Sequence, residues 1–241
     1  DRPDLGIGLA GPADAQEARE RRPLDSSEAE VFRGVGRLNV GGTRFCSAAL
    51  ISERLVITAA HCLFHPRTFR PVPIDDLRFV AGQNADAMAA ERGASRVAIP
   101  PDFVFDGRPS FEHLRRDIAL VELDAPITPA ESPSYGVGET PPPEAVIEIV
   151  SYVRGRARVP SLQDGCRIDA VVGQVAALDC GVNLGASGAP VFALDKGGRW
   201  LWGVVSSTGT LVNGGEVTLT VRVEPELAAL EAALEPRVPP R

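Results

Sequence analysis

The chain has 241 residues, of which 44% are hydrophobic, and its 32 acidic and 25 basic side chains give a net charge of -7. Such a composition can bury a sizeable core, which argues against a disordered chain. The negative charge argues against nucleic acid as a partner, because phosphate binding rewards clustered Lys and Arg. No apolar stretch approaches the roughly 20 residues that span a bilayer, so we expect no membrane partner either.

The N-terminal residues 1–30 are polar and contain runs of charge. We interpret them as a lead-in to the fold or the remnant of a propeptide. Because the chain begins with Asp1 rather than Met, we expect that an upstream segment, such as a secretory signal, has been removed, although no such signal is visible.

Two runs of short segments rich in Val, Ile, Leu and Thr follow, separated by Gly, Pro and Asp. The first run is predicted at residues 37–40, 45–51, 55–58, 77–81, 96–99 and 118–123. The second is predicted at residues 146–154, 165–173, 174–179, 190–193, 200–206 and 216–223. Short strands at this spacing are typical of a sandwich or a barrel.

The two runs define the expected domains. Residues 31–124 form the first β unit and residues 144–223 the second. Between them, residues 125–143 hold six of the 21 prolines, which predicts a stiff interdomain linker. In residues 224–241, Leu at helical spacing after an early Pro predicts a short C-terminal helix and a tail.

The chain has four cysteines, Cys46, Cys62, Cys166 and Cys180. No pair has C-x-x-C spacing, which disfavours a zinc site. An even count split two and two along the chain is typical of two local disulfides in an oxidising compartment, and three pairings are possible. The alternative is four buried free thiols in a cytosolic protein.

His61 ends the run Leu-Val-Ile-Thr-Ala-Ala-His-Cys. A rigid strand can aim a histidine at its end into a cleft, and histidine is the side chain best suited to act as a base near neutral pH. The alternative is a surface or core histidine without a catalytic role. Asp117 precedes the apolar run Ile-Ala-Leu-Val, and taken alone it would be an ordinary turn residue or strand cap.

Ser187 lies among small residues in Gly185-Ala-Ser-Gly-Ala-Pro190. Small neighbours allow the amides of Gly185 and Ser187 to point toward one spot, where they could hold an oxyanion. The alternative is a flexible loop. The motif is not the nucleophile elbow of α/β-hydrolases, because the parallel-sheet pattern is missing. The three residues occur in the order His61, Asp117, Ser187. In such a triad the histidine is the base that takes the proton of the serine, and the aspartate holds the histidine in the right tautomer.

With these three motifs the sequence resembles the trypsin/chymotrypsin superfamily of serine proteases over residues 34–235. The resemblance implies an all-β fold of two six-stranded antiparallel β-barrels with a short C-terminal helix and the triad in the cleft between the barrels. It also implies the disulfides Cys46–Cys62 and Cys166–Cys180, and a role for Ser206 in supporting the triad aspartate.

The sequence also departs from the digestive members of that family. Ala186 stands where they have Asp, and no Ile-Val-Gly-Gly-like start follows a basic residue, so their zymogen switch cannot operate here in the same way. The chain looks more like the bacterial branch that includes the V8-like glutamyl endopeptidases. Yet Val205 stands where those enzymes typically place a His, and Gly181 stands where a trypsin-like pocket has Asp.

The pocket for the P1 side chain is therefore expected to be uncharged and to be formed by Gly181, Val182, Thr208 and Thr218. We predict a secreted or periplasmic bacterial serine endopeptidase, monomeric, that cleaves after small or medium uncharged residues. It acts on peptides or proteins through an acyl-enzyme and needs no metal or cofactor. Activity should fall as His61 protonates, near its ordinary pKa of about 6.5. The alternatives are a catalytically silent binding module with this fold and an esterase that uses the same triad.

Overall fold

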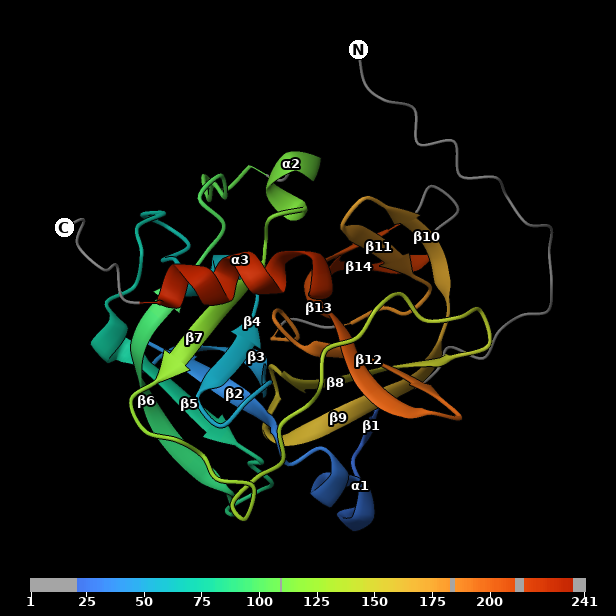
Figure 1. Cartoon of the computed structure of the whole chain (residues 1–241), viewed down its shortest axis with the longest axis horizontal. Helices are drawn as coiled ribbons and strands as arrows, with labels where there is room; N and C mark the ends of the chain where they lie inside the picture. Colours follow the sequence, from blue (N-terminus) through green and yellow to red (C-terminus); the bar gives the residue numbers. More distant parts are fainter. Residues whose placement is uncertain (1–20, 109, 183–184, 211–214, 236–241) are drawn as a thin grey trace.

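The computed structural model describes residues 21–108, 110–182, 185–210 and 215–235, and it shows two β units packed against each other (Figure 1). One hydrophobic cluster crosses the boundary between them, with Val35 and Ile57 of the first unit against Phe192 and Leu201 of the second. The described secondary structure is mostly strand, which confirms the predicted all-β class. Because side chains from both units share this core, the relative position of the two units is set by packing.

The first unit is a closed six-stranded barrel, as predicted, with the strand order β2-β3-β4-β7-β6-β5. Its inner face carries large apolar side chains such as Leu38, Leu50 and Phe79, all fully buried. Two 3-10 turns, η1 (Ala60–Leu63) and η2 (Ile74–Asp76), follow β4 and precede β5. The strands are β2 (Val35–Val40), β3 (Arg44–Leu50), β4 (Leu55–Thr58), β5 (Leu77–Ala81), β6 (Ala90–Ala98) and β7 (Ala119–Leu123).

The second unit differs from the expected six-stranded barrel. Its ladder is an eight-stranded sheet in the order β1-β9-β8-β12-β13-β14-β11-β10, and it is not closed by hydrogen bonds among the described residues. The Cys166–Cys180 disulfide instead ties the end of β9 to the segment after β11. The strands are β1 (Arg22–Pro23), β8 (Val146–Val153), β9 (Arg156–Cys166), β10 (Ile168–Val172), β11 (Val175–Leu178), β12 (Pro190–Asp195), β13 (Gly198–Thr210) and β14 (Glu216–Arg222).

The prediction missed most of β9 and joined its end to β10 as one strand at residues 165–173. β9 contains Pro160, Gln163 and Asp164, which interrupt the apolar pattern that signals a strand. In the structure β9 pairs with β8 along most of its length, and its register shifts twice along the ladder. Pairing with a regular neighbour therefore overrides the weak local preference of this segment.

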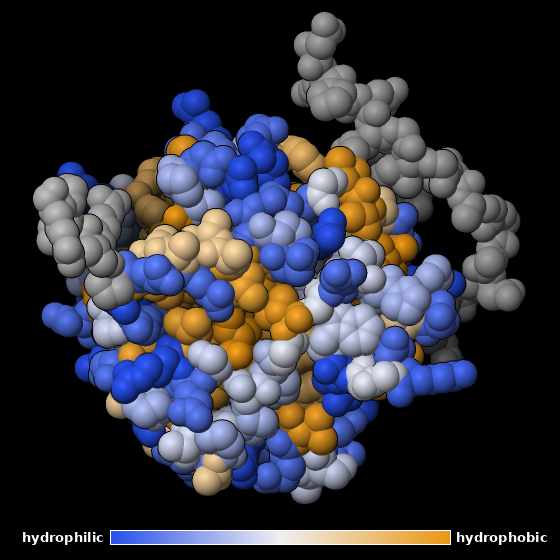
Figure 2. All heavy atoms as spheres, in the orientation of Figure 1, coloured by the Kyte–Doolittle hydropathy of each residue, from blue (hydrophilic) through white to orange (hydrophobic). Residues whose placement is uncertain are grey.

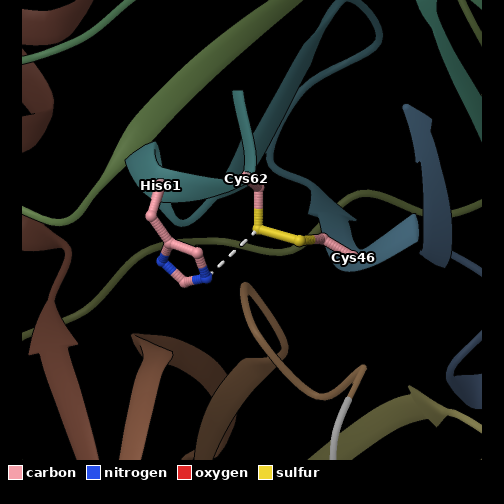
Figure 3. A group of neighbouring side chains, drawn as sticks. All are labelled: Cys46, His61 and Cys62. Atoms are coloured by element: carbon pink, nitrogen blue, oxygen red, sulfur yellow. Dashed lines mark hydrogen bonds between the residues drawn. A yellow bond between two sulfur atoms is a disulfide. The ribbon is translucent and has the colours of Figure 1, made fainter. Parts of the chain in front are cut away.

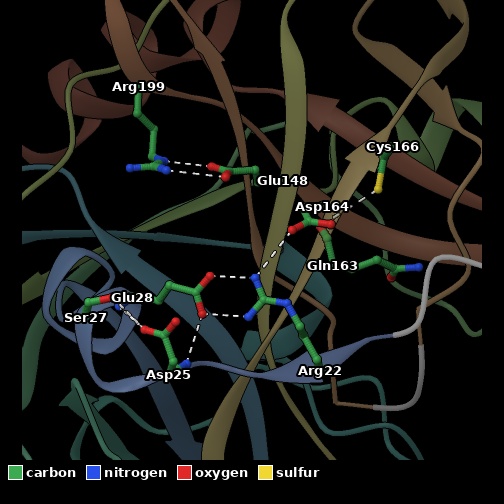
Figure 4. A network of polar contacts seen from close by, with 9 residues as sticks. All are labelled: Arg22, Asp25, Ser27, Glu28, Glu148, Gln163, Asp164, Cys166 and Arg199. Carbon is green, nitrogen blue, oxygen red and sulfur yellow. Dashed lines mark hydrogen bonds and ion pairs between the residues drawn. The ribbon is translucent and has the colours of Figure 1, made fainter.

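Part of the predicted lead-in, the strand β1, belongs to the second sheet. β1 pairs with β9 through Arg22 opposite Leu162. A capping box, in which Asp25 and Glu28 accept each other's backbone N–H, starts α1 (Ser26–Val31). The Arg22 guanidinium donates to both carboxylate oxygens of Glu28, at 2.6 and 2.5 Å (Figure 4). The rest of the predicted lead-in, residues 1–20, lies outside the described residues.

The linker predicted at residues 125–143 contacts both units. The backbone N–H of Tyr135 donates to Leu50 O at 2.9 Å, and that of Gly138 donates to Leu201 O at 3.1 Å. The hydroxyl of Tyr135 also donates to O of Val31, the last residue of α1, at 3.1 Å. The segment is therefore held along its length by hydrogen bonds to both units.

The predicted C-terminal helix is α3 (Glu224–Leu234), which packs against β6 and β7 and buries Leu230 and Leu234. Hydrophilic residues cover most of the face in Figure 2, and hydrophobic residues gather around the position of α3. A further short helix, α2 (Phe111–Leu114), lies just before Asp117. In the described part of the chain, no helix is long and apolar enough to cross a membrane.

Candidate active site

His61 and Asp117 meet at one edge of the first barrel because of strand pairing. β4 and β7 are antiparallel, with Thr58 opposite Ala119. The residues that follow β4 and those that precede β7 therefore lie at the same end of the two strands. His61 sits in η1 after β4, and Asp117 lies two residues before β7.

Asp117 holds the histidine at two points. Its Oδ1 accepts the backbone N–H of His61 at 2.7 Å, and its Oδ2 lies 2.6 Å from Nδ1 of the imidazole. The Ser206 hydroxyl, from β13 of the second unit, also donates to Oδ2 of Asp117. The Asp117 side chain is only 7% exposed, whereas that of His61 is 23% exposed. The imidazole is thus fixed in orientation and still reachable from the cleft.

Opposing influences act on the pKa of His61. Burial is the largest and lowers the pKa, because it disfavours the charged imidazolium. The charge of Asp117 and its hydrogen bond raise it, and the charge of Arg44, the smallest of these influences, lowers it. The two contributions of Asp117 prevail, so the pKa of His61 lies above its ordinary value.

The turn that carries Ser187 lies against the strand end that precedes His61. The backbone N–H of Ser47 on β3 donates to Ser187 O at 2.9 Å, and that of Gly188 donates to Val205 O at 2.7 Å. Gly188 has φ +75°, and a Cβ there would lie 3.0 Å from the backbone nitrogen of Ala59. Only glycine permits this approach, which brings the serine turn against the residues just before His61.

The free ring nitrogen of His61, Nε2, points toward the neighbouring disulfide. Nε2 lies 3.9 Å from Sγ of Cys62, and Figure 3 shows this contact beside the bond from Cys62 to Cys46. Among the described residues, no hydrogen bond joins Ser187 Oγ to His61. Catalytic hydrogen bonds are often long without substrate and tighten when it binds, so this arrangement is compatible with an unliganded enzyme.

The backbone N–H groups of Gly185 and Ser187 are the next feature of the serine turn. Gly185 has φ +102°, and a Cβ there would lie 3.0 Å from Arg154 N and from Tyr152 O. In the described part of the chain, neither the Gly185 nor the Ser187 amide has an acceptor. Two neighbouring amides without internal partners are the chemical requirement for holding an oxyanion.

Ser47 is a site residue that the sequence analysis missed. Its buried hydroxyl donates to Gly185 O at 3.2 Å and accepts the backbone N–H of Tyr152 at 2.9 Å. It thus links the first barrel to the turn that carries Ser187. The one signal in the sequence was its position directly after Cys46, because the disulfide from Cys46 to Cys62 places this segment near His61.

The two disulfides are Cys46–Cys62 and Cys166–Cys180, in agreement with the pairing that the resemblance implied. Sulfur atoms of the first pair and a ring nitrogen of His61 lie within 4.8 Å of one another, a grouping like that of metal ligands. Both sulfurs are already joined in the disulfide, so neither is available as a thiolate ligand. This group therefore does not fit a metal ion.

A cavity of about 630 Å³ opens beside the histidine and was not predicted. Its walls combine His61, Asp117 and Ser206 with aromatic side chains from residues 103–111. The ring of Phe105 lies 6.2 Å from that of His61 and packs edge-on against Phe69 at 5.6 Å. The signal in the sequence was the Phe-Val-Phe run that precedes α2.

The four residues expected to form the P1 pocket differ in their surroundings. Thr208 on β13 is opposite Thr218 on β14. Thr208 is exposed, but Thr218 is fully buried and its hydroxyl donates to Cys180 O. Val182 is buried and Gly181 is half-buried. Thr218 therefore supports the segment that carries Gly181 rather than facing solvent.

Glu216 is a further residue of this region that the expectation of an uncharged pocket did not include. A Cβ on Gly181 would lie 2.6 Å from Cδ of the Glu216 side chain. The space beside Gly181 is thus covered by a carboxylate. Its position depends on the register of β14, which the sequence does not show.

Comparison with known proteins agrees with this geometry. The profile of the trypsin family, described as "Trypsin", matches residues 25–225. The chain belongs to the trypsin family. Coagulation factor IX of Oryctolagus cuniculus is 31% identical to this trypsin-family chain over 86 residues, which are 35% of the chain and 28% of the relative. The chain thus matches under a third of that relative's length.

The fold has counterparts among solved structures. A structure described as a Glu endopeptidase in complex with MPD superimposes with a TM-score of 0.71 at 15% sequence identity. The match covers 88% of this trypsin-family chain and 95% of that one. At this identity the likeness concerns the fold alone.

Proposed function

We propose that this chain is a serine endopeptidase with His61, Asp117 and Ser187 as its catalytic triad. The observation that carries the proposal is the pair of contacts between His61 and Asp117. They orient Nδ1 toward the carboxylate and leave Nε2 for the proton of the nucleophile. Membership of the trypsin family supports a hydrolase of this type.

In the proposed reaction, Ser187 Oγ attacks the peptide carbonyl and His61 accepts its proton. Asp117 stabilises the imidazolium, and Ser206 holds Asp117 in place. The amides of Gly185 and Ser187 stabilise the oxyanion, and His61 then gives its proton to the leaving amine. Water hydrolyses the acyl-enzyme in a second half-reaction with the same roles.

The substrates that we propose are peptides or proteins. The cavity beside His61 is lined by Phe103, Phe105 and Phe111, so it suits apolar side chains next to the scissile bond. The four residues expected at the P1 pocket, Gly181, Val182, Thr208 and Thr218, carry no charge, which supports a small or medium uncharged P1 residue.

The site of action that we propose is an oxidising compartment, outside the cell or in a periplasm. Two disulfides support this, because disulfides persist where thiols are not kept reduced. A bacterial source and a monomeric state stay predictions.

A fluorophosphonate probe, with the modified residue mapped by mass spectrometry, tests the proposal directly. We expect labelling at Ser187 in the folded chain and none in a Ser187→Ala variant. A folded wild-type chain that is neither labelled nor active on a peptide library would overturn the proposal.

A catalytically silent binding module is the second candidate. The observation in its favour is that Ser187 Oγ has no hydrogen bond to His61 among the described residues. Peptide binding without labelling or cleavage would support it. Turnover of esters without turnover of peptides would instead indicate an esterase that uses the same triad.

A further inference from the structure

Glu216 occupies a position beside Gly181 that no part of the proposed mechanism uses. Side chains two residues apart on a strand share a face, so Glu216 lies on the same face of β14 as Thr218. Thr218 holds Cys180, the residue before Gly181, through its hydroxyl. The Glu216 side chain covers Gly181, and it is exposed and so within reach of a ligand.

This carboxylate lies in the region where we propose that the P1 side chain binds. Gly181 precedes Ser187 by six residues, and β14 is paired with β13, which carries Ser206. A carboxylate in a P1 pocket attracts Arg and Lys, and Arg can bind it through two parallel hydrogen bonds. Glu216 alone would therefore make the pocket selective for basic side chains.

Arg21 brings the opposite charge to the same place. Its Nη2 donates to Gly181 O at 3.4 Å, so the guanidinium and the Glu216 carboxylate both lie beside one glycine. Burial is the main cause that lowers the pKa of Arg21, and Arg156 adds to it, whereas Glu216 acts in the opposite direction. Nε of Arg21 is buried and has no hydrogen-bond partner among the described residues.

The backbone beside Arg21 is fixed. Arg22 and Pro23 pair with β9, and Arg22 is bound at both ends of its guanidinium to Glu28 (Figure 4). The Arg21 side chain therefore starts from an anchored strand. Its contact with Gly181 spans 160 residues of sequence, and no local preference accounts for it.

We propose that Arg21 and Glu216 together determine the P1 preference. The Arg21 guanidinium balances the Glu216 carboxylate, so the intact chain cleaves after uncharged residues, and loss of Arg21 changes the preference to Arg and Lys. This proposal rests on the proposed endopeptidase function. It makes an N-terminal residue part of the specificity pocket of the second unit.

A double-mutant cycle in the full chain tests the proposal. Arg21→Gln, Glu216→Gln and the double variant are compared with wild type on peptides that differ only in having Ala, Arg or Glu at P1. We expect kcat/KM for Arg relative to Ala to rise about tenfold in Arg21→Gln, as one unmasked ion pair would give. The ratio for Glu should rise in Glu216→Gln, and the double variant should return to the wild-type preference.

Two control variants make the test specific. Arg33→Gln removes the same charge from a residue on the far side of α1, and it should leave the P1 preference unchanged. Arg21→Lys keeps the charge and should keep the wild-type preference. Wild-type cleavage that already favours Arg, or an unchanged ratio in Arg21→Gln, would overturn the proposal.

A binding measurement separates this proposal from the proposed activity. Phenylguanidinium is titrated by NMR into Ser187→Ala chains with and without Arg21→Gln. Tighter binding in the Ser187→Ala chain that also carries Arg21→Gln supports the masked Glu216 carboxylate. This holds even if no peptide is ever cleaved, in which case only the proposed activity fails. Equal binding overturns the pocket proposal, whatever the activity of the wild-type chain.

Discussion

The two halves of the candidate site are assembled in different ways. The histidine half lies within one closed barrel, where β4 and β7 pair and bring His61 and Asp117 together. The serine half lies in a turn of the open second sheet, held by backbone bonds from Ser47 and to Val205. The first half therefore depends on strand register, and the second depends on one contact from the first barrel and one within its own unit.

Removal of a member of the triad should have the largest effect. His61→Ala removes the base, and we expect a loss of about 10⁶-fold in kcat, as for the loss of a triad base elsewhere. Because His61 is partly exposed, the variant should fold normally. Steady-state kinetics with circular dichroism checks both points, and a variant that keeps most of its activity would contradict the assigned base.

Loss of the charge on Asp117 should have the next largest effect. Asp117→Asn keeps the size of the side chain but no longer favours the productive tautomer of His61, so we expect a loss of about 10⁴-fold in kcat. Ser206→Ala is a milder control, because it removes one hydrogen bond to the same carboxylate. Equal losses in the two variants would argue that Asp117 acts only through packing.

The link between the halves can be weakened at Ser47. Ser47→Ala leaves the buried N–H of Tyr152 without its acceptor, which should cost about 1–3 kcal/mol in the free energy of unfolding. Loss of the bond to Gly185 O loosens the backbone that carries the two proposed oxyanion donors. We therefore expect kcat to fall by less than the roughly 10²–10³-fold loss caused by removing such a donor, with KM unchanged. Thermal unfolding and kinetics measure the two effects. A change in KM alone would indicate a role in binding instead.

The pH profile offers the finest comparison. Because Asp117 raises the pKa of His61, the imidazolium persists to higher pH, and the acid limb of kcat/KM should have its midpoint above about 6.5. Neutralising Asp117 should move that midpoint to lower pH. A midpoint below 6.5 in the wild-type chain would mean that burial prevails over the carboxylate.

The sequence allowed the first barrel to be predicted more closely than the second sheet. β4 and β5 have the predicted bounds because each holds a short cluster of apolar residues, Leu-Val-Ile in β4 and Phe-Val-Ala in β5. β9 was missed because Pro and polar residues break its pattern. A local pattern predicts a strand only where the strand's own side chains form the core.

The candidate site divides in the same way. His61, Asp117 and Ser187 stand in motifs that can be read from a few adjacent residues, and their catalytic roles stay predictions that the geometry supports. Ser47, Glu216 and Arg21 take their places through contacts between distant segments. The register of β13 and β14 shifts between Val205 and Ser207, and such a shift cannot be derived from composition.

The two-residue strand β1 has a consequence for association between copies of the chain. An exposed sheet edge presents unpaired N–H and C=O groups to which another chain can add. β1 covers β9 at Ser161 and Leu162, and Pro23 has no N–H to offer in turn. A chain that began after Pro23 would present this part of β9 to its neighbours, so the same short segment that carries Arg21 also protects the second sheet from edge-to-edge aggregation.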